Sequence, residues 1–277
     1  MIGVDRVAII GLGLIGGSIA RELASRQVRV HAFDENPHDL RAAIDAGVVH
    51  HSLDASLNGL SDVQMIVIAV PVDSAIDVLG RIAPHVSSAA LVIDVGSTKT
   101  SIVDAATQLG IGPVFVGSHP FTGDHRSGWV SSRLGLFSGA RVYLCPASDT
   151  SGGAIERALA FWRELGADVR TMTAEDHDRS VAWTSHLPHV IANAVALALA
   201  CNGVQREDLG PGGRDVTRLA GSSPEMWTAI LRENAGAVDG ALAAVQREIA
   251  GFRDAIARGD ADALRCRFAD ARDWFSA

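Results

Sequence analysis

The stretch VAIIGLGLIGG, from Val7 to Gly17, decides the fold of this chain. Its first four residues form a short apolar run typical of a buried strand. Gly11, Gly13 and Gly16 follow in the spacing GxGxxG. The first glycine permits a tight turn, the second lets a phosphate approach the backbone, and the third lets the next helix pack closely on the strand. Because the N terminus of such a helix attracts phosphate groups, the stretch predicts a dinucleotide site.

An acidic residue, Asp34, ends the second predicted strand in HAFDENP, 18 residues beyond Gly16. A carboxylate there accepts hydrogen bonds from the adenosine ribose hydroxyls and repels a 2′-phosphate, which favours NAD over NADP. Arg41 or a neighbouring arginine could still reach a phosphate. The residues expected to contact the cofactor are Gly11, Gly13, Leu14, Ile15, Gly16, Asp34, Val70, Pro71 and Ser97.

The hydrophobic pattern changes near Thr173. Before it, short apolar runs alternate with helical stretches, which predicts a doubly wound parallel α/β sheet with helices on both faces. After it, long alanine-rich helical segments have wide apolar faces that pack on one another and on a second subunit. We therefore predict a Rossmann-type NAD-binding domain at residues 1–172 and an all-helical substrate and dimerisation domain at residues 173–277. The strands are expected at 7–10, 28–33, 65–70, 91–95, 114–116, 142–145 and 168–172, and the long helices at 178–201, 227–256 and 261–275.

Composition bounds the function. The 277 residues are 48% hydrophobic and carry a net charge of -8, which argues against a nucleic-acid partner and means that an acidic substrate must meet local cations. The three cysteines are widely spaced and form neither a disulfide framework nor a CxxC metal pattern, which fits a reducing cytoplasm. The longest apolar run, Val190 to Cys201, is too short to span a bilayer, so a soluble cytoplasmic protein without a membrane partner is expected.

Two further motifs carry polar side chains at predicted strand ends. In GSHPFTGDHRSGW, His119 lies between the apolar run at 114–116 and a polar, glycine-broken loop, and an imidazole exchanges a proton near neutral pH. In DVGSTKTS, Ser97 follows the strand at 91–95 and either contacts a ligand or caps the helix that starts near Thr100. A triphosphate-binding loop is rejected for DVGSTKTS, because Thr98 occupies the position of the glycine that must precede the lysine.

Five motifs in series resemble those of the prephenate/arogenate dehydrogenase family of tyrosine biosynthesis: GLGLIGGS, DVGSTK, GSHPFTGDHRSGW, TSHLPHVIANAV and RDVTRLAGSSPEMW. The match covers nearly the whole chain in the family's order. It implies a Rossmann domain followed by a helical dimerisation domain, with the active site in the cleft between them. The implied reaction is the NAD-dependent oxidative decarboxylation of a cyclohexadienol, in which aromatisation drives the loss of carbon dioxide, so that no metal is required.

The resemblance also implies roles for individual residues. His119 matches the histidine that takes the proton of the substrate hydroxyl, and Ser97 matches the serine that hydrogen-bonds this histidine and the substrate. Arg218 matches the arginine that binds a substrate carboxylate, since a guanidinium grips a carboxylate through two hydrogen bonds. His189 is implied as a substrate contact, and Trp227 matches a tryptophan near the substrate.

For some residues the sequence leaves two roles open. Arg214 is either a second cation for the dicarboxylate substrate or a solvated surface charge. His186 and His189 are three residues apart and would suit a metal on one helix face, but no third ligand is evident, and His186 is expected to shape the site.

The loop after His119 departs from the family pattern, which more commonly reads HPMAG, at Phe121, Thr122 and Asp124. Three substrates stay open: prephenate, arogenate, or an amino-substituted prephenate analogue of specialised metabolism. Asp124 or Asp215 would favour an ammonium group on the substrate if either faces the site, and Asp124 could instead pair with Arg126 in a turn. Two other classes of protein are alternatives. A β-hydroxyacid or imine reductase usually has a catalytic lysine in its helical domain, and this chain has no lysine from Thr173 onward. The other class is a non-catalytic NAD-binding protein.

Overall fold

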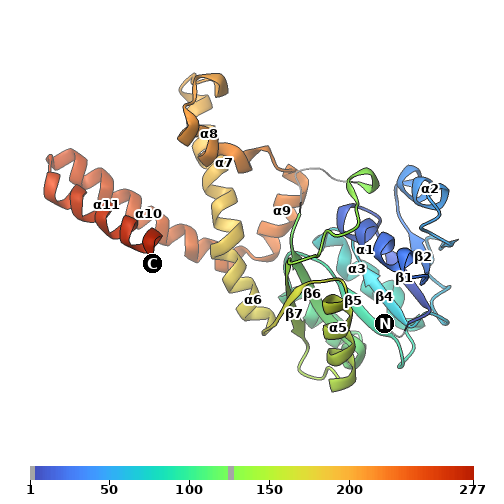
Figure 1. Cartoon of the computed structure of the whole chain (residues 1–277). Coiled ribbons are helices and arrows are strands. Elements are labelled where there is room, and N and C mark those ends of the chain that lie inside the picture. The colour runs from blue at the N-terminus through green and yellow to red at the C-terminus, as the bar shows by residue number, and fades with distance from the viewer. Residues whose placement is uncertain (1–3, 124–127) are drawn as a thin grey trace.

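The computed structural model describes residues 4–123 and 128–277, which form a sheet-centred body and a projecting helical half (Figure 1). In the described residues, one eight-stranded sheet has the order β3-β2-β1-β4-β5-β6-β7-β8. Its neighbours are parallel except for β6 and β7, which are antiparallel. The strands are β1 Arg6–Ile10, β2 Arg29–Phe33, β3 His51–Ser52, β4 Met65–Ile68, β5 Leu91–Asp94, β6 Phe115–Phe121, β7 Arg141–Pro146 and β8 Asp168–Thr171.

Helices cover both faces of this sheet, as the alternating pattern predicts. One apolar core lies between the sheet and α1, α2 and α5, and the other between the sheet and α3, α4 and, from the helical half, α9 (Pro224–Glu233). The central strands β1 and β4 are buried on both faces and therefore read as continuous apolar runs. The covering helices are α1 Leu14–Ser25, α2 Pro37–Asp45, α3 Val72–Ile82, α4 Thr100–Gln108 and α5 Gly152–Glu164.

The strand order places a crevice at the carboxyl ends of β1 and β4. The chain leaves β1 toward β2 on one side of the sheet and returns to β4 on the other, which is where open α/β sheets bind their ligands. Gly11 adopts φ +95°, and a Cβ there would lie 2.3 Å from the carbonyl oxygen of Ala69. A Cβ on Gly16 would lie 2.0 Å from the carbonyl oxygen of Gly11. The tight turn and the close helix packing therefore both require glycine.

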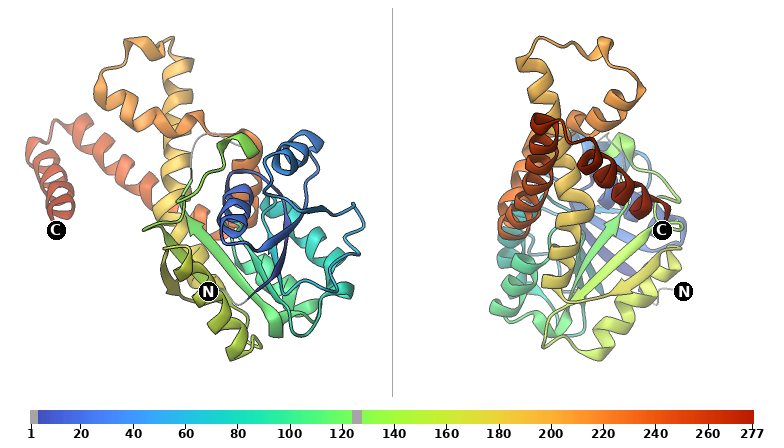
Figure 2. Two further views of the ribbon diagram at one scale, coloured as in Figure 1. Left: turned by 45° about the vertical axis from the view of Figure 1, so that its right-hand side comes forward. Right: turned by 90° about the vertical axis from the view of Figure 1, so that its left-hand side faces the viewer.

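The helical half contains α6 Ala174–Val181, a π-helix at Ala182–His186, α7 Leu187–Cys201, α8 Pro211–Thr217, α9 Pro224–Glu233, α10 Ala235–Arg258 and α11 Ala261–Ser276. Pro188 lacks an amide hydrogen and crowds the turn before it, which accounts for the widened π-turn. The single helix expected at 227–256 is wrong, because Asn234 leaves helical geometry and separates α9 from α10. Figures 1 and 2 show α10 and α11 projecting together as an antiparallel pair.

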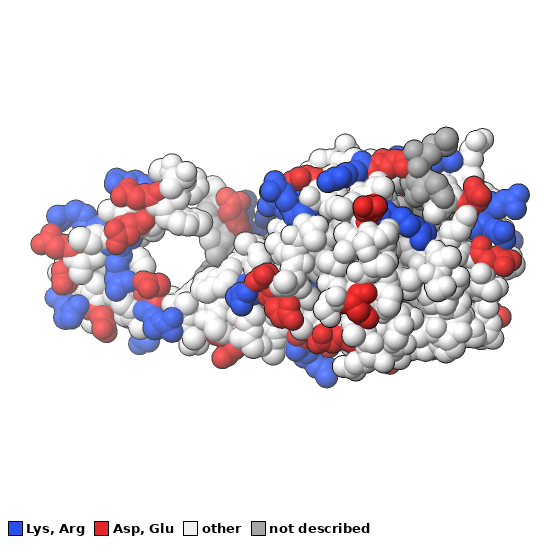
Figure 3. Space-filling view, turned by 90° about the horizontal axis from the view of Figure 1, so that it is seen from below, with Lys and Arg blue, Asp and Glu red and all other residues white. Residues whose placement is uncertain are grey.

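Much of the helical half exposes apolar side chains. Within the described residues one continuous helix, Ala174–Cys201, is long and apolar enough to cross a membrane by length and composition, and only 17% of its most apolar window is buried. The apolar run at Val190 to Cys201 is thus the end of a longer helix, because α6 and α7 continue through the π-turn. Seen from below, the helical half surrounds an opening, with acidic and basic side chains interspersed around it (Figure 3).

Strand β6 is longer than the sequence predicts. The expected strand ends at Val116, whereas β6 continues to Phe121 and pairs His119 with Tyr143 of β7. The antiparallel partner supplies hydrogen bonds along the polar part of the motif, so the pairing extends beyond the apolar run. His119 therefore lies on a strand and not on a loop.

Candidate active site

His119 lies at the carboxyl edge of the sheet. Because β6 is parallel to β5, β4 and β1, it ends on the same side as the glycine-rich turn. The His119 side chain is 8% exposed and has Phe121 edge-on to its ring, with ring centroids 5.6 Å apart. The strand and these neighbours hold the imidazole in a fixed orientation at the edge of the crevice.

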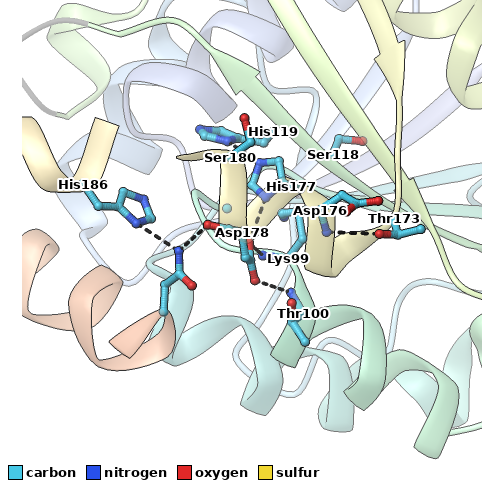
Figure 4. A network of polar contacts seen from close by, with 12 residues as sticks. Lys99, Thr100, Ser118, His119, Thr173, Asp176, His177, Asp178, Ser180 and His186 are labelled. Atoms are coloured by element: carbon cyan, nitrogen blue, oxygen red, sulfur yellow. Dashed lines mark hydrogen bonds and ion pairs between the residues drawn. The ribbon is translucent and has the colours of Figure 1, made fainter. Parts of the chain in front are cut away.

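A chain of polar contacts runs from His119 to α6 (Figure 4). Nδ1 of His119 is 2.9 Å from Nε2 of His177, and Nδ1 of His177 is 2.8 Å from Oδ1 of Asp178. The Asp178 carboxylate also accepts hydrogen bonds from the backbone amides of Lys99 and Thr100, at 2.8 and 2.9 Å. Burial alone would raise the pKa of Asp178, but the hydrogen bonds from His177, Thr100 and Lys99 outweigh it and hold this pKa at about 2.

Next to this chain lies a buried ion pair. Lys99, the only lysine of the sequence, is 0% exposed and its Nζ contacts Oδ2 of Asp94. The Asp94 carboxylate also accepts hydrogen bonds from the amides of Gly96 at 2.8 Å and Ser118 at 3.1 Å. Because Asp94 ends β5 and Ser118 directly precedes His119 on β6, the paired Asp94 carboxylate fixes the ends of both strands relative to each other.

The surroundings keep His119 neutral. Burial lowers its pKa well below the usual value of 6.5, and the neighbouring His177 and Lys99 lower it further. Burial likewise lowers the pKa of His186 to about 4. A neutral imidazole has one ring nitrogen without a hydrogen and can accept a proton.

A second group of side chains extends the site into the helical half. The ring of His189 stacks on Trp227, with centroids 3.6 Å apart, and the exposed Arg218 lies close enough to His189 to lower its pKa further after burial. Nδ1 of His189 and Nε1 of Trp227 are buried and have no hydrogen-bond partner among the described residues. Two polar atoms and a cation that have no partner among the described side chains fit a site for an anionic ligand.

His186 has a supporting position in this group. Its ring meets the edge of Trp227, with centroids 5.8 Å apart, and its Nδ1 is 3.2 Å from Nδ2 of Asn234. Asn234 also donates to the carbonyl of Asp178 at 2.7 Å. The described residues contain no group of three histidine, cysteine or acidic side chains that could hold a metal.

One predicted contact, between Ser97 and His119, is not made in the described residues. Ser97 is partly buried and forms no hydrogen bond within the described chain, so the expected bond to His119 is replaced there by the contact with His177. The hydroxyl of Ser97 thus stays available to a ligand. Asp124, expected at the substrate, lies outside the described residues.

The glycine-rich turn fits a dinucleotide. Among residues 4–123 and 128–277, no side chain caps the N terminus of α1 and no atom lies within 4 Å of a Cβ built on Gly13, so a phosphate can approach the backbone there. The Asp34 carboxylate accepts hydrogen bonds from the amides of Leu12 at 2.5 Å and Asn36 at 2.7 Å, which fixes it beside the turn. The remaining predicted contacts, Leu14, Ile15, Val70 and Pro71, line the turn after β1 and the end of β4.

The sequence matches the models of two known domain families. The model of the prephenate dehydrogenase nucleotide-binding domain matches residues 19–171, and the model of the prephenate dehydrogenase dimerization domain matches residues 173–270. The chain belongs to the prephenate dehydrogenase family. The resemblance stated from the motifs and the predicted fold class are both confirmed.

Individual relatives agree with this assignment. The prephenate dehydrogenase of Bacillus subtilis (strain 168) is 33% identical, over 98% of this chain and 75% of the relative. The crystal structure of Aquifex aeolicus prephenate dehydrogenase with hydroxyphenyl propionate and NAD+ is 27% identical and covers 98% of both chains with a TM-score of 0.90. The structure of Synechocystis arogenate dehydrogenase is 28% identical, covering 98% of this chain and 99% of that one, with a TM-score of 0.81. The cofactor prediction of NAD is thereby confirmed.

Sequence reasoning did not find His177, Asp178 or the Asp94–Lys99 pair. The pair lies in DVGSTKTS, for which the sequence raised only Ser97 and a rejected phosphate loop, although Lys99 is the single lysine in a chain with 23 arginines. His177 and Asp178 follow a helix start in AEDHDRS, where acidic residues are common as helix-end charges. Nothing in that local pattern indicates a contact with a strand 58 residues earlier.

Proposed function

We propose that this chain oxidises prephenate or arogenate with NAD and releases carbon dioxide, with His119 as the general base. The observation that carries the proposal is His119 itself, neutral and buried at the same carboxyl edge of the sheet as the glycine-rich turn. One ring nitrogen contacts His177, and the other has no partner among the described protein groups, so it is available to a substrate hydroxyl.

The reaction needs a proton acceptor and an electron acceptor at one carbon. NAD supplies the hydride acceptor when it is bound on the glycine-rich turn. His119 takes the proton of the ring hydroxyl as the hydride leaves the same carbon, and Ser97 hydrogen-bonds that hydroxyl. Loss of the ring carboxylate as carbon dioxide then makes the ring aromatic.

The substrate carboxylates are held in the helical half. Arg218 is the proposed anchor, because it is exposed without an ion pair in the described chain and stands beside His189. His189 and Trp227 contribute the unpaired polar atoms at the same place. Ala229 and Ile230 of α9 pack into the core beneath the sheet together with Val70 and Trp227, which brings this anchor to the crevice.

A substrate panel tests the function. Purified protein is given prephenate, arogenate or an amino-substituted prephenate, each with NAD and with NADP, and the reduced cofactor is followed by absorbance. We expect NADH from prephenate or arogenate. Turnover of the amino-substituted compound alone would assign the chain to specialised metabolism, and cofactor binding without turnover of any compound would make it a non-catalytic NAD-binding protein.

Replacing Arg218 by alanine is expected to raise KM by about 10- to 100-fold, because a hydrogen bond to a charged group contributes roughly 1.5 to 3 kcal/mol. The matched control is Arg214→Ala, since within the described residues Arg214 donates to the backbone carbonyl of Glu207 alone, at 3.3 Å. Steady-state kinetics of both variants separate the roles. An equal KM for Arg218→Ala and wild type would place the carboxylate elsewhere, and a large effect of Arg214→Ala would make it the second cation.

The pH profile should reflect the lowered pKa of His119. A general base acts only when unprotonated, so activity is lost as pH falls through its pKa. Because burial places that pKa below 6.5, we expect kcat/KM to stay on its plateau at pH 6.5 and to fall only at more acidic pH. An acid limb with its midpoint above pH 6.5 would contradict the environment described for His119.

The helical half supports a homodimer. α7 exposes Leu197, and α11 exposes Phe268, Trp274 and Phe275, which a second copy would cover. The domain boundary is proposed between residues 172 and 173, since β8 ends at Thr171 and α6 begins at Ala174. We further propose that the dimer is soluble and cytoplasmic. Light scattering in buffer without detergent should give twice the chain mass of 29.0 kDa, and a monomer at micromolar concentration would contradict it.

A further inference from the structure

The contacts of His119 cross between the two halves of the chain. His119 is on β6 of the sheet, whereas His177 and Asp178 are on α6, the first helix of the helical half (Figure 4). All three side chains are buried, with His177 0% exposed. Water therefore cannot take the place of a hydrogen-bond partner within this group. The direction of each hydrogen bond then determines the direction of the next.

The order of donors follows from Asp178. Its carboxylate already accepts two backbone amide hydrogens at the start of α4 and can only accept, so Nδ1 of His177 must carry a hydrogen. In a neutral ring Nε2 of His177 then has no hydrogen and accepts. The donor to it is Nδ1 of His119. Nε2 of His119 is consequently the nitrogen without a hydrogen.

We propose that His177 and Asp178 are positioning residues that fix the tautomer of His119, so that its bare Nε2 faces the substrate. The inference rests on the proposed function, because it specifies how the base of that reaction is prepared. When Nε2 takes the hydroxyl proton, the ring gains a positive charge. The Nδ1–H bond to His177 and the negative charge of Asp178 stabilise that charge.

The arrangement also links the base to the docking of the two halves. Asp178 holds the N terminus of α4 through the amides of Lys99 and Thr100, and Asn234 of the segment between α9 and α10 donates to the Asp178 carbonyl. A displacement of α6 would remove the acceptor of His119 and the cap of α4 together. The tautomer is thus set only when the helical half is in contact with the sheet.

Two variants of His177 distinguish the roles of its two ring nitrogens. In His177→Gln the amide oxygen reaches the place of Nε2 and still accepts from His119, whereas in His177→Asn the amide reaches only the place of Nδ1 and keeps the contact with Asp178. We expect kcat of His177→Asn to fall by about 100-fold and kcat of His177→Gln to stay within about 10-fold of wild type, both with unchanged KM and NAD affinity. Equal kcat values for the two variants would overturn the proposal.

A spectroscopic measurement does not depend on turnover. Nitrogen-15 NMR of the imidazole rings of the wild-type protein should give the Nδ1–H tautomer for both His119 and His177. Finding the hydrogen of His119 on Nε2 would overturn the proposal even if neither variant folds. If the ring tautomers are as expected but wild type turns over no substrate, the proposed function fails while the relay stands.

Discussion

Replacing His119 by asparagine is expected to lower kcat by about 10²- to 10⁴-fold, the contribution typical of a positioned general base. Asparagine can still donate from its amide to Nε2 of His177, as Nδ1 of His119 does, so the buried contact is kept. It has no group that takes a proton near neutral pH. Since the glycine-rich turn is untouched, the Kd for NAD should not change.

Stopped-flow kinetics and a cofactor titration measure these two quantities. The control is His51→Asn, an exposed histidine on the edge strand β3, which should have wild-type kcat. Circular dichroism checks that the His119 variant is folded. A folded His119→Asn protein with wild-type kcat would remove His119 as the base.

Replacing Lys99 by methionine is expected to reduce the free energy of unfolding by about 3 to 5 kcal/mol, because it leaves the Asp94 carboxylate buried without its partner. The double variant Lys99→Met with Asp94→Asn removes both charges and should recover part of that loss. Urea unfolding at one protein concentration measures both, since dimer stability depends on concentration. A single variant within about 1 kcal/mol of wild type would show that the pair is dispensable.

The same substitution has a kinetic consequence. The Lys99 cation lowers the pKa of His119, so its removal should raise that pKa. A base with a higher pKa becomes protonated at higher pH, and the acid limb of kcat/KM should move to higher pH than in wild type. An acid limb that moves to lower pH would contradict this electrostatic role.

The sheet-centred half was largely predictable, because its signals are local. Gly11 and Gly16 stand in one recognisable spacing, with Gly16 packed on Gly11 and Gly11 on Ala69 just after β4, and apolar runs such as Met65–Ile68 mark strands buried on both faces. The two-residue strand β3 carries no such signal. The extension of β6 to Phe121 escaped prediction because it depends on the antiparallel partner β7, which polar residues 117–121 do not reveal.

The site was predictable where a motif carries the chemistry and not where folding creates it. His119, Ser97, His189, Arg218 and Trp227 are found from motifs, and the structure brings His189, Arg218 and Trp227 together. Their roles stay predictions. The link from His119 through His177 to Asp178 arises only when α6 packs on the sheet. The helix break at Asn234 also depends on tertiary contacts, since the Asn234 side chain donates to the carbonyl of Asp178 and contacts Nδ1 of His186.

The most direct test of the central claim is the simultaneous measurement of NADH and carbon dioxide from prephenate and from arogenate. Hydride transfer to NAD and loss of the ring carboxylate belong to one reaction, so wild type should form the two products in equal amounts with at least one of these substrates. His119→Asn should lose both in parallel. No NADH from either substrate, or NADH formed without carbon dioxide, would contradict the account.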